Sequence, residues 1–384
     1  MGYLKVAPNI DTASPQFMED LLNQINERII KETTREILRD ERNILRDERK
    51  QAWSPKRTKA PFYGRARGNS RIVSFQKVVE LAEKVVDHLG TPWKESKRGR
   101  PPQFSSKKLT SALLVKHYFP LSFETLREKL LEIRLDCRKD TNNRRGVKVP
   151  STSELHWTLS KIPIKYLQEA LRLLDDWTVE LHTDLFGIEK LNKLGVDGTE
   201  TTCIELEEYM SGLKKGLRRE TNRVNALIRL VTNTVCEVKS SKKENLRDLT
   251  KLLKCRKKSK RSISQLEIYG DGAYDAEKNY EITSLNESEL IVKPTKYTKK
   301  KPRGFFRKQG HTTFSARKYK IRKTVERPFG NISLRDGNKL WYKRPDMRQK
   351  GEILRFIAHN MKAYFMQEAW AKVFKNLSQD KKMS

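Results

Sequence analysis

Apolar residues recur at helical spacing through the first half of the chain. Between Ile72 and Leu89 they occupy one face at intervals of three and four residues, which predicts an amphipathic helix. The same pattern predicts three more helices, over Leu109–Phe119, Phe123–Leu135 and Ile164–Leu185. The stretch PSTSELHWTLSKIP predicts a further short helix, with Ser151 or Ser153 as its N-cap. Residues 72–186 therefore form a helical region, with a basic loop over 136–149.

The pattern changes near residue 190. Apolar, β-branched runs predict strands at LNKLGVDG, at Asn225–Val238, at SQLEIYGDGAY and at ELIVKP. Between and after them the pattern predicts helices over Asn245–Cys255, 315–327 and Glu352–Phe374, and a basic loop over 296–310. Strands that alternate with helices favour an α/β layered domain over residues 190–365. Residues 366–384 would then be the end of the last helix and a basic tail.

The N-terminal extension, residues 1–53, is highly charged and contains the repeat ILRDERN–ILRDERK. Ile30, Ile37 and Ile44 recur every seven residues, as in the seam of a coiled coil. A dimerising helix and a solvated helix on the protein's own surface both fit two heptads. Residues 54–71 carry two Pro, two Gly and many basic residues, which predicts a linker.

The charge balance changes the picture of the partner. The chain has 81 Lys and Arg against 48 Asp and Glu, a formal charge of +33. Such an excess favours a polyanion, above all nucleic acid, because neutralising phosphates releases counterions. An anionic membrane surface is the alternative. No apolar run approaches the roughly 20 residues of a spanning helix, and no signal-peptide pattern is present. The four cysteines lack metal-binding spacing, so we expect reduced thiols in a cytoplasmic protein.

Three carboxylates stand out by position. Asp197 in LGVDGTE and Asp271 in IYGDGAYD each end a predicted strand, and Glu326 in YKIRKTVERPFG lies on a predicted helix. Acids at the ends of adjacent strands can converge at the edge of a sheet. Oxygen ligands suit Mg²⁺, and two such ions support phosphodiester chemistry. Alternatively, each Asp beside a Gly caps a turn and Glu326 is an ordinary helical residue. Only the set of three is informative.

The contexts of these acids resemble the three acidic motifs of DDE transposases of prokaryotic insertion sequences. Tyr319, Arg322 and Glu326 stand at that family's Tyr-x2-Arg-x3-Glu spacing, and VERPFG and RFIAHNMKA resemble its continuation and last helix. RGRPPQFS, PLSFETLREKL and VPSTSELHW resemble its N-terminal region, so the resemblance covers most of the chain beyond residue 95. One departure is Ser333, where some members carry Lys; the nearest following lysine is Lys339.

The resemblance implies a ribonuclease-H-like α/β catalytic domain, preceded by an all-helical DNA-binding domain. It implies binding of double-stranded DNA by a homodimer, cleavage at the element ends and joining of the 3′-OH ends to target DNA. Asp197, Asp271 and Glu326 would hold two Mg²⁺ or Mn²⁺ ions, and Tyr319 and Arg322 would contact the phosphate near the scissile bond. A nuclease without strand transfer and an inactive or domesticated DNA-binding derivative are the alternatives.

Neighbouring residues receive other expectations. Asp275 and Glu200 lie close to the candidate acids, and we expect both to be structural. Pro328, two residues past Glu326, should bend or end its helix.

Several basic segments are candidates for DNA contact. Arg98 and Arg100 in KRGRPP would suit a narrow minor groove, or belong to a basic linker. The helix of PSTSELHWTLSKIP would be the second helix of a helix-turn-helix, with His156, Trp157 and Lys161 facing either DNA or the core. Two further basic clusters would contact DNA or be solvated faces: one contains Lys257 and Lys258, the other Lys300 and Arg303. The second cluster also contains aromatic rings.

Overall fold

The computed structural model describes residues 73–93, 103–138, 147–187, 191–203, 221–241, 248–258, 262, 264–294, 303–336, 339–340, 342 and 344–383. All of them belong to one compact unit, Asn69–Ser384. The predictions for residues 1–53 and 54–71, for Arg98 and Arg100, and for Lys300 concern positions outside these ranges. None of the described helices is long and apolar enough to cross a membrane.

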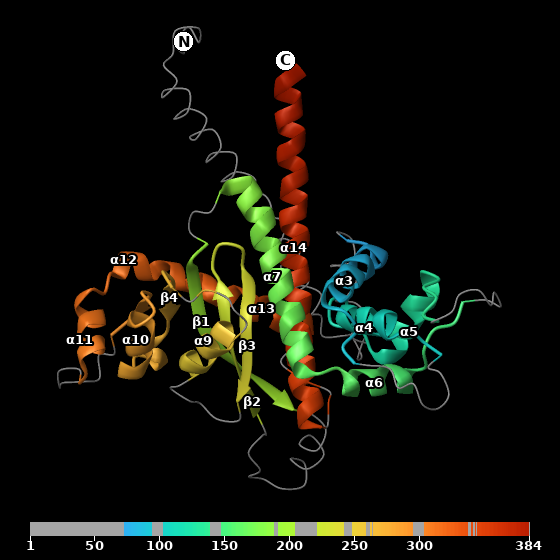
Figure 1. Ribbon diagram of the computed structural model, residues 1–384, viewed down its shortest axis with the longest axis horizontal. Helices are drawn as coiled ribbons and strands as arrows, with labels where there is room; N and C mark the ends of the chain where they lie inside the picture. Colours follow the sequence, from blue (N-terminus) through green and yellow to red (C-terminus); the bar gives the residue numbers. More distant parts are fainter. Residues whose placement is uncertain are drawn as a thin grey trace, which may run out of the picture. The chain divides into compact units, whose positions relative to one another are not determined.

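A mixed sheet forms the centre of the fold (Figure 1). Its strands are β1 (Lys193–Cys203), β2 (Thr221–Arg229), β3 (Thr234–Ser241), β4 (Glu267–Gly270), β5 (Glu289–Val292) and β6 (Lys339–Leu340). The order is β3-β2-β1-β4-β5, and β6 pairs with the last residues of β1. The first three strands are antiparallel, whereas β1, β4 and β5 are parallel. The predicted mixture of helices and strands is therefore confirmed.

Among the described residues, five helices precede the sheet, close to where the periodicity predicts them. They are α3 (Phe75–Leu89), α4 (Ser106–Val115), α5 (Phe123–Glu132), α6 (Thr152–Lys161) and α7 (Ile164–Phe186). At the start of α6, Ser151 is the N-cap: its Oγ accepts a hydrogen bond from the Glu154 amide, and the Glu154 carboxylate accepts one from the Ser151 amide. This reciprocal capping box decides between the two predicted caps in favour of Ser151.

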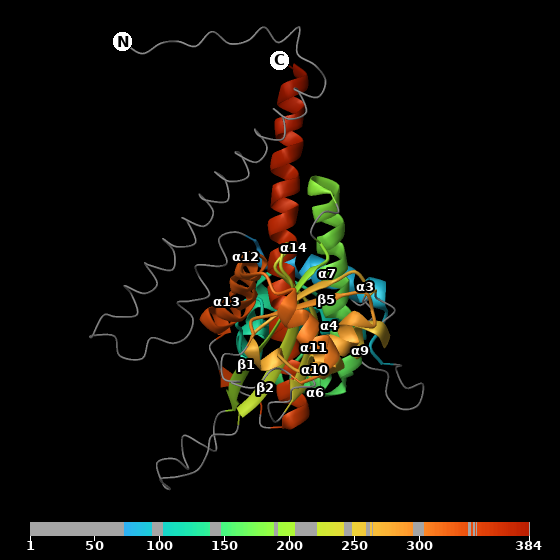
Figure 2. The ribbon, with the colours of Figure 1, turned by 90° about the vertical axis from the view of Figure 1, so that its left-hand side faces the viewer.

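Helices cover both faces of the sheet. On one face, α7 and α14 (Pro345–Met383) lie side by side in both views and pack against β3 (Figures 1 and 2). Asn360 on α14 joins all three: its Nδ2 donates to Leu171 O and Val235 O, and its Oδ1 accepts from the Val235 amide. On the other face, α9 (Asp248–Lys258) and α10 (Glu277–Ser284) cover a smaller apolar core.

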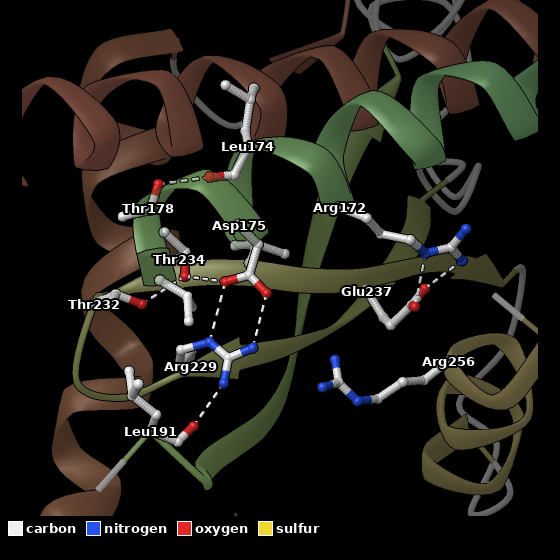
Figure 3. Close-up of polar contacts among 12 residues, drawn as sticks. Arg172, Leu174, Asp175, Thr178, Leu191, Arg229, Thr232, Thr234, Glu237 and Arg256 are labelled. Atoms are coloured by element: carbon white, nitrogen blue, oxygen red, sulfur yellow. Dashed lines mark hydrogen bonds and ion pairs between the residues drawn. The ribbon is translucent and has the colours of Figure 1, made fainter. Parts of the chain in front are cut away.

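Buried ion pairs fix α7 to the sheet (Figure 3). Asp175 on α7 accepts hydrogen bonds from Arg229 Nε and Nη2 at 3.2 and 3.0 Å, and Thr234 donates to the same carboxylate. One turn earlier, Arg172 donates to Glu237 at 2.7 and 2.6 Å. Because these groups are almost fully buried, each charge depends on its partner.

The structure corrects two predicted segments before the last motif. The run Asn225–Val238 contains a hairpin, in which β2 and β3 are joined through Asn233 with a left-handed φ of 57°. The predicted loop 296–310 is wrong in its second half, because α11 (Phe305–Thr312) begins there. The Glu277 carboxylate accepts hydrogen bonds from the Phe306 and Arg307 amides and so satisfies the first turn of α11.

The segment that carries the last motif is not one helix. It consists of α12 (Ala316–Tyr319), a 3₁₀ stretch (Lys320–Val325) and α13 (Glu326–Asp336). We expected Pro328 to bend or end its helix; the helix does not end there, because α13 runs on to Asp336. Pro328 lies in the first turn of α13, where the missing amide hydrogen has no intrahelical partner to lose. The helix before it changes character earlier, at the 3₁₀ stretch.

Candidate active site

The pairing of β1 with β4 places the first two acids next to each other, at the point where β4 ends. The parallel register matches Gly195 with Tyr269 as its last pair. Asp197 and Asp271 each lie two residues beyond that pair, on neighbouring chain segments. Asp197 still belongs to β1, whereas Asp271 follows the last residue of β4. The strand register therefore places these two predicted ligands at equivalent positions along β1 and β4.

Gly195 allows the third acid to approach. A Cβ atom at Gly195 would lie 2.2 Å from Cγ2 of Val325, which is fully buried. Only a residue without a side chain admits Val325 at this point on β1. Since Glu326 follows Val325 directly and starts α13, this close packing sets the position of the Glu326 backbone beside β1.

The three acids converge on one guanidinium group, that of Arg322. Its Nη1 lies 3.1 Å from Glu326 Oε1, and its Nη2 lies 3.3 Å from Asp197 Oδ2 and 4.0 Å from Asp271 Oδ2. The structure thus brings together four residues that are separated by up to 129 positions in the sequence. Arg322 and Glu326 face each other because they are four residues apart along the helical segment.

Each aspartate divides its two oxygens between the backbone and the site. Asp197 Oδ1 accepts a hydrogen bond from the Gly198 amide at 2.8 Å, and Asp271 Oδ1 accepts one from the Ala273 amide at 3.0 Å. Their Oδ2 atoms are the ones nearest to Arg322. The two interpretations of these residues, turn caps and metal ligands, are therefore compatible, because the cap fixes the carboxylate and leaves one oxygen directed at the site.

Burial and neighbouring charges both shift the pKa of Asp197. Burial raises this pKa above its ordinary value, and the nearby carboxylates of Asp271 and Glu326 raise it further. The Gly198 amide and the Arg322 guanidinium act in the opposite direction. Raising the pKa means that the ionised form is disfavoured here. A cluster of three carboxylates in this setting is stabilised by a cation.

Tyr319 ties the helical segment to the sheet. Its hydroxyl donates a hydrogen bond to Gly270 O at 3.2 Å, one residue before Asp271. Burial raises the pKa of Tyr319, and the carboxylates of Asp271, Asp197 and Glu326 add to the effect. The phenol therefore stays protonated near neutral pH and lies beside the acids.

The donor set fits a magnesium or manganese ion in chemistry. Carboxylate oxygens from three segments are the ligands that Mg²⁺ prefers, with water or phosphate completing the shell. In the described part of the chain, however, no group of three or more His, Cys, Asp or Glu side chains is arranged to hold a metal ion as it stands. The guanidinium of Arg322 lies within 4.0 Å of all three acids.

Asp275 forms a separate buried ion pair behind the site. Its carboxylate accepts hydrogen bonds from Arg307 Nε and Nη2 at 2.9 and 2.7 Å and from His311 Nε2 at 2.8 Å. Burial alone would raise its pKa, but these hydrogen bonds outweigh burial and lower the pKa to about 2. The pair fastens α11 to the turn after Asp271, which agrees with the structural role we expect for Asp275. Sequence reasoning missed Arg307 and His311, because their partner lies more than 30 residues away.

The other predicted positions lie outside this cluster. Lys257 and Lys258 are exposed in the last turn of α9, and Arg303 is exposed just before α11. The side chain of Glu200 lies outside the described residues. Ser333, where some members of the family carry Lys, lies in α13, and Lys339 is the first residue of β6.

The exposed face of α6 resolves one open alternative. Leu155 and Leu159 are buried, whereas His156, Trp157 and Lys161 point to solvent rather than into the core. Lys161 Nζ lies 3.4 Å from the centroid of the Trp157 ring. These three residues are therefore available to a partner.

Comparisons with known proteins add no further information on the family. No protein-family model, no curated protein and no solved structure matches this chain. The functional argument rests on the motifs and on the geometry described above.

Proposed function

We propose that this protein is a DDE-type transposase, which cleaves DNA at the ends of an insertion sequence and joins the freed 3′-OH ends to target DNA. One observation carries the proposal. Asp197, Asp271 and Glu326 come from three distant segments, yet they converge on a single cationic group at the edge of the sheet. The i,i+4 spacing accounts for the Glu326 contact alone; the two aspartates reach the same guanidinium from the neighbouring segments of β1 and β4.

The fold is compatible with the proposal. A mixed six-stranded sheet flanked by helices, with one acid within β1 and one directly after the adjacent parallel strand β4, suits a ribonuclease-H-like catalytic domain. The helices α3 to α7 that precede the sheet occupy the place of the proposed DNA-binding region. The exposed His156, Trp157 and Lys161 on α6 are its best candidates for contacts with DNA.

In this proposal each residue of the site has a distinct task. Asp197, Asp271 and Glu326 would hold two Mg²⁺ or Mn²⁺ ions, which activate the attacking oxygen and stabilise the leaving oxygen. Arg322 would bind a non-bridging phosphate oxygen pair through its planar fork. Tyr319, held by Gly270 O, would position the helical segment and line the site beside the phosphate.

The partners follow from the charge and the reaction. A formal charge of +33 suits long contact with double-stranded DNA, with Lys257, Lys258 and Arg303 as exposed contributors. Since two ends have to be cut and joined, a homodimer on DNA is the proposed assembly. A protein that acts on chromosomal DNA would be found at the nucleoid, in the cytoplasm.

The test separates binding from cleavage. We expect D197N, D271N and E326Q to bind duplexes made from the DNA that borders the coding region as wild type does, but to lose Mg²⁺-dependent strand cleavage by at least about 100-fold. The matched control is D87N, since Asp87 is an exposed carboxylate on α3 paired with Lys107. A triad variant that cleaves at the wild-type rate removes that residue from the site.

The same experiment distinguishes the two alternatives. Cleavage without joining to a second DNA favours a nuclease that lacks strand transfer. Binding without any metal-dependent cleavage by wild type favours an inactive or domesticated DNA-binding derivative.

A further inference from the structure

The ion pairs of Arg322 differ from the other arginine pairs of this protein. Arg172, Arg229 and Arg307 each hold one buried carboxylate through two nitrogens, at 2.6 to 3.2 Å. Arg322 instead makes single contacts of 3.1, 3.3 and 4.0 Å that are spread over three carboxylates. Strong charge-assisted pairs of arginine are short and bidentate. The guanidinium of Arg322 thus lacks a two-pronged pair with any single carboxylate.

A second observation points in the same direction. The Nε atom of Arg322 is buried and has no hydrogen-bond partner among the described residues. Leaving a buried charged donor without a partner costs free energy. The present arrangement therefore satisfies Arg322 incompletely, although its two Nη atoms face three acids. A ligand that offered an acceptor to Nε of Arg322 would satisfy this side chain more completely.

The backbone that carries Arg322 has the features of a hinge. Arg322 lies in the 3₁₀ stretch Lys320–Val325, between the α-helical turns of α12 and α13. A 3₁₀ stretch within a helical segment often marks a hinge or a sequence under strain. On either side the segment is fixed, by Tyr319 on Gly270 O and by the buried Val325 against Gly195.

Charge decides what shares the site with Arg322. Three carboxylates and one guanidinium leave two negative charges uncompensated, so a divalent cation is attracted to the cluster. A divalent ion among the same oxygens would be repelled by the guanidinium at these distances. Metal and Arg322 therefore compete for the acids, unless the guanidinium moves to another anion. A DNA phosphate is such an anion, and the planar fork of arginine matches it.

We propose that Arg322 is a positioning residue that stands in for the metal in the DNA-free protein. It holds the three acids together, and a DNA phosphate draws it away, so that metal and DNA bind with positive coupling. This inference rests on the proposed function, because it takes Asp197, Asp271 and Glu326 as the metal ligands. Its consequence is regulatory: the free protein loads metal poorly and becomes competent for cleavage only on DNA.

The test measures Mn²⁺ binding to the full-length protein by electron paramagnetic resonance of the free ion. Without DNA, we expect R322Q to bind Mn²⁺ about tenfold more tightly than wild type, because the competing charge is gone. After the Mn²⁺ bound by the duplex alone is subtracted, a saturating random-sequence duplex should tighten Mn²⁺ binding to wild type by a similar factor and leave R322Q nearly unchanged. A merely structural arginine would give the opposite result, since its loss would loosen the acids and weaken binding.

Controls keep the outcomes distinct. R317Q removes an exposed arginine of α12 and should bind Mn²⁺ as wild type does in the absence of DNA. If R322Q loses its fold by circular dichroism, the neutral variant R322M is used, and the effect of DNA on wild type still tests the coupling. Equal or weaker Mn²⁺ binding by R322Q, or no effect of DNA on wild type, overturns the inference.

D197N separates this inference from the proposed function. If D197N removes Mn²⁺ binding while R322Q leaves it unchanged, the metal site stands and the competition is wrong. If D197N binds Mn²⁺ as tightly as wild type, the metal site itself is wrong, and both proposals fail.

Discussion

At the scale of single residues, the site depends on small groups that surround the acids. Gly195 admits Val325, and the backbone amides of Gly198 and Ala273 each hold one oxygen of an aspartate. These contacts leave the second oxygen of each aspartate directed at Arg322. The sequence motifs predicted which acids belong to the site. They did not predict the contact of Gly195 with Val325, because it joins β1 to a residue 130 positions later.

Gly195 gives a prediction about geometry rather than charge. In G195A the new methyl group would collide with Val325 Cγ2, which lies 2.2 Å from the ideal Cβ position. We expect Val325 and Glu326 to shift and DNA cleavage to fall by about 10- to 100-fold, since small misplacements of catalytic groups cost this much. The matched control is G330A, because a Cβ at Gly330 meets nothing within 4 Å. Equal cleavage by G195A and wild type would contradict the packing argument.

Asp275 gives a prediction about stability and pH. Its pKa is lowered to about 2, so its ion pair stabilises the protein above the ordinary pKa of an aspartate and the effect is lost as the pH falls towards 2. We expect D275N to be less stable by about 1–2 kcal/mol at pH 7, less than the full shift implies because Arg307 and His311 reach solvent. Urea denaturation from pH 7 to pH 3 measures it. A difference between the two proteins that does not shrink in acid would show that another effect dominates.

At the scale of elements, periodicity predicted most helices and strands, and it failed where contacts distant in sequence decide the structure. The helix α11 was expected to be a loop, because its first turn is satisfied by Glu277 from α10 rather than by a local cap. The segment around Pro328 was expected to end a helix and instead begins one. The convergence of the acids followed from the strand pattern. The place of Arg322 among them required the three-dimensional arrangement.

The attachment of α7 to the sheet can be tested through the Arg229–Asp175 pair (Figure 3). We expect R229M to destabilise the protein by about 3–5 kcal/mol, because it leaves Asp175 buried without its cation. The double variant D175L/R229M should recover part of this loss, since neither charge is then left alone. Urea denaturation provides the free energies of unfolding. A double variant that is no more stable than R229M would show that the pair does more than neutralise itself.

At the scale of the whole molecule, the proposed function would give the basic charge and the acid cluster complementary tasks. The excess of Lys and Arg suits the DNA backbone, whereas the few acids at the sheet edge suit the ions that act on it. Under the proposed function, this division would account for three carboxylates lying together in a protein with a formal charge of +33.

The charge predicts how binding responds to salt. We expect the affinity for a random-sequence duplex to fall by about 10³-fold or more between 50 and 200 mM salt, as for a protein that contacts at least about six phosphates. Fluorescence anisotropy with a labelled duplex measures the dependence. A change of less than about threefold would contradict an electrostatic DNA interface.

The most direct test of the central claim is a change of ligand chemistry at the site. In D197C and D271C a thiolate replaces a carboxylate oxygen; Mg²⁺ binds it poorly, whereas Mn²⁺ accepts it better. With DNA that borders the coding region as substrate, we predict that cleavage by both variants falls at least about 100-fold in Mg²⁺ and is partly restored in Mn²⁺, while D197A and D271A stay inactive in both. Cleavage by D197C or D271C at the wild-type rate in Mg²⁺, or equal rescue of the alanine variants by Mn²⁺, would contradict the assignment of these acids as metal ligands.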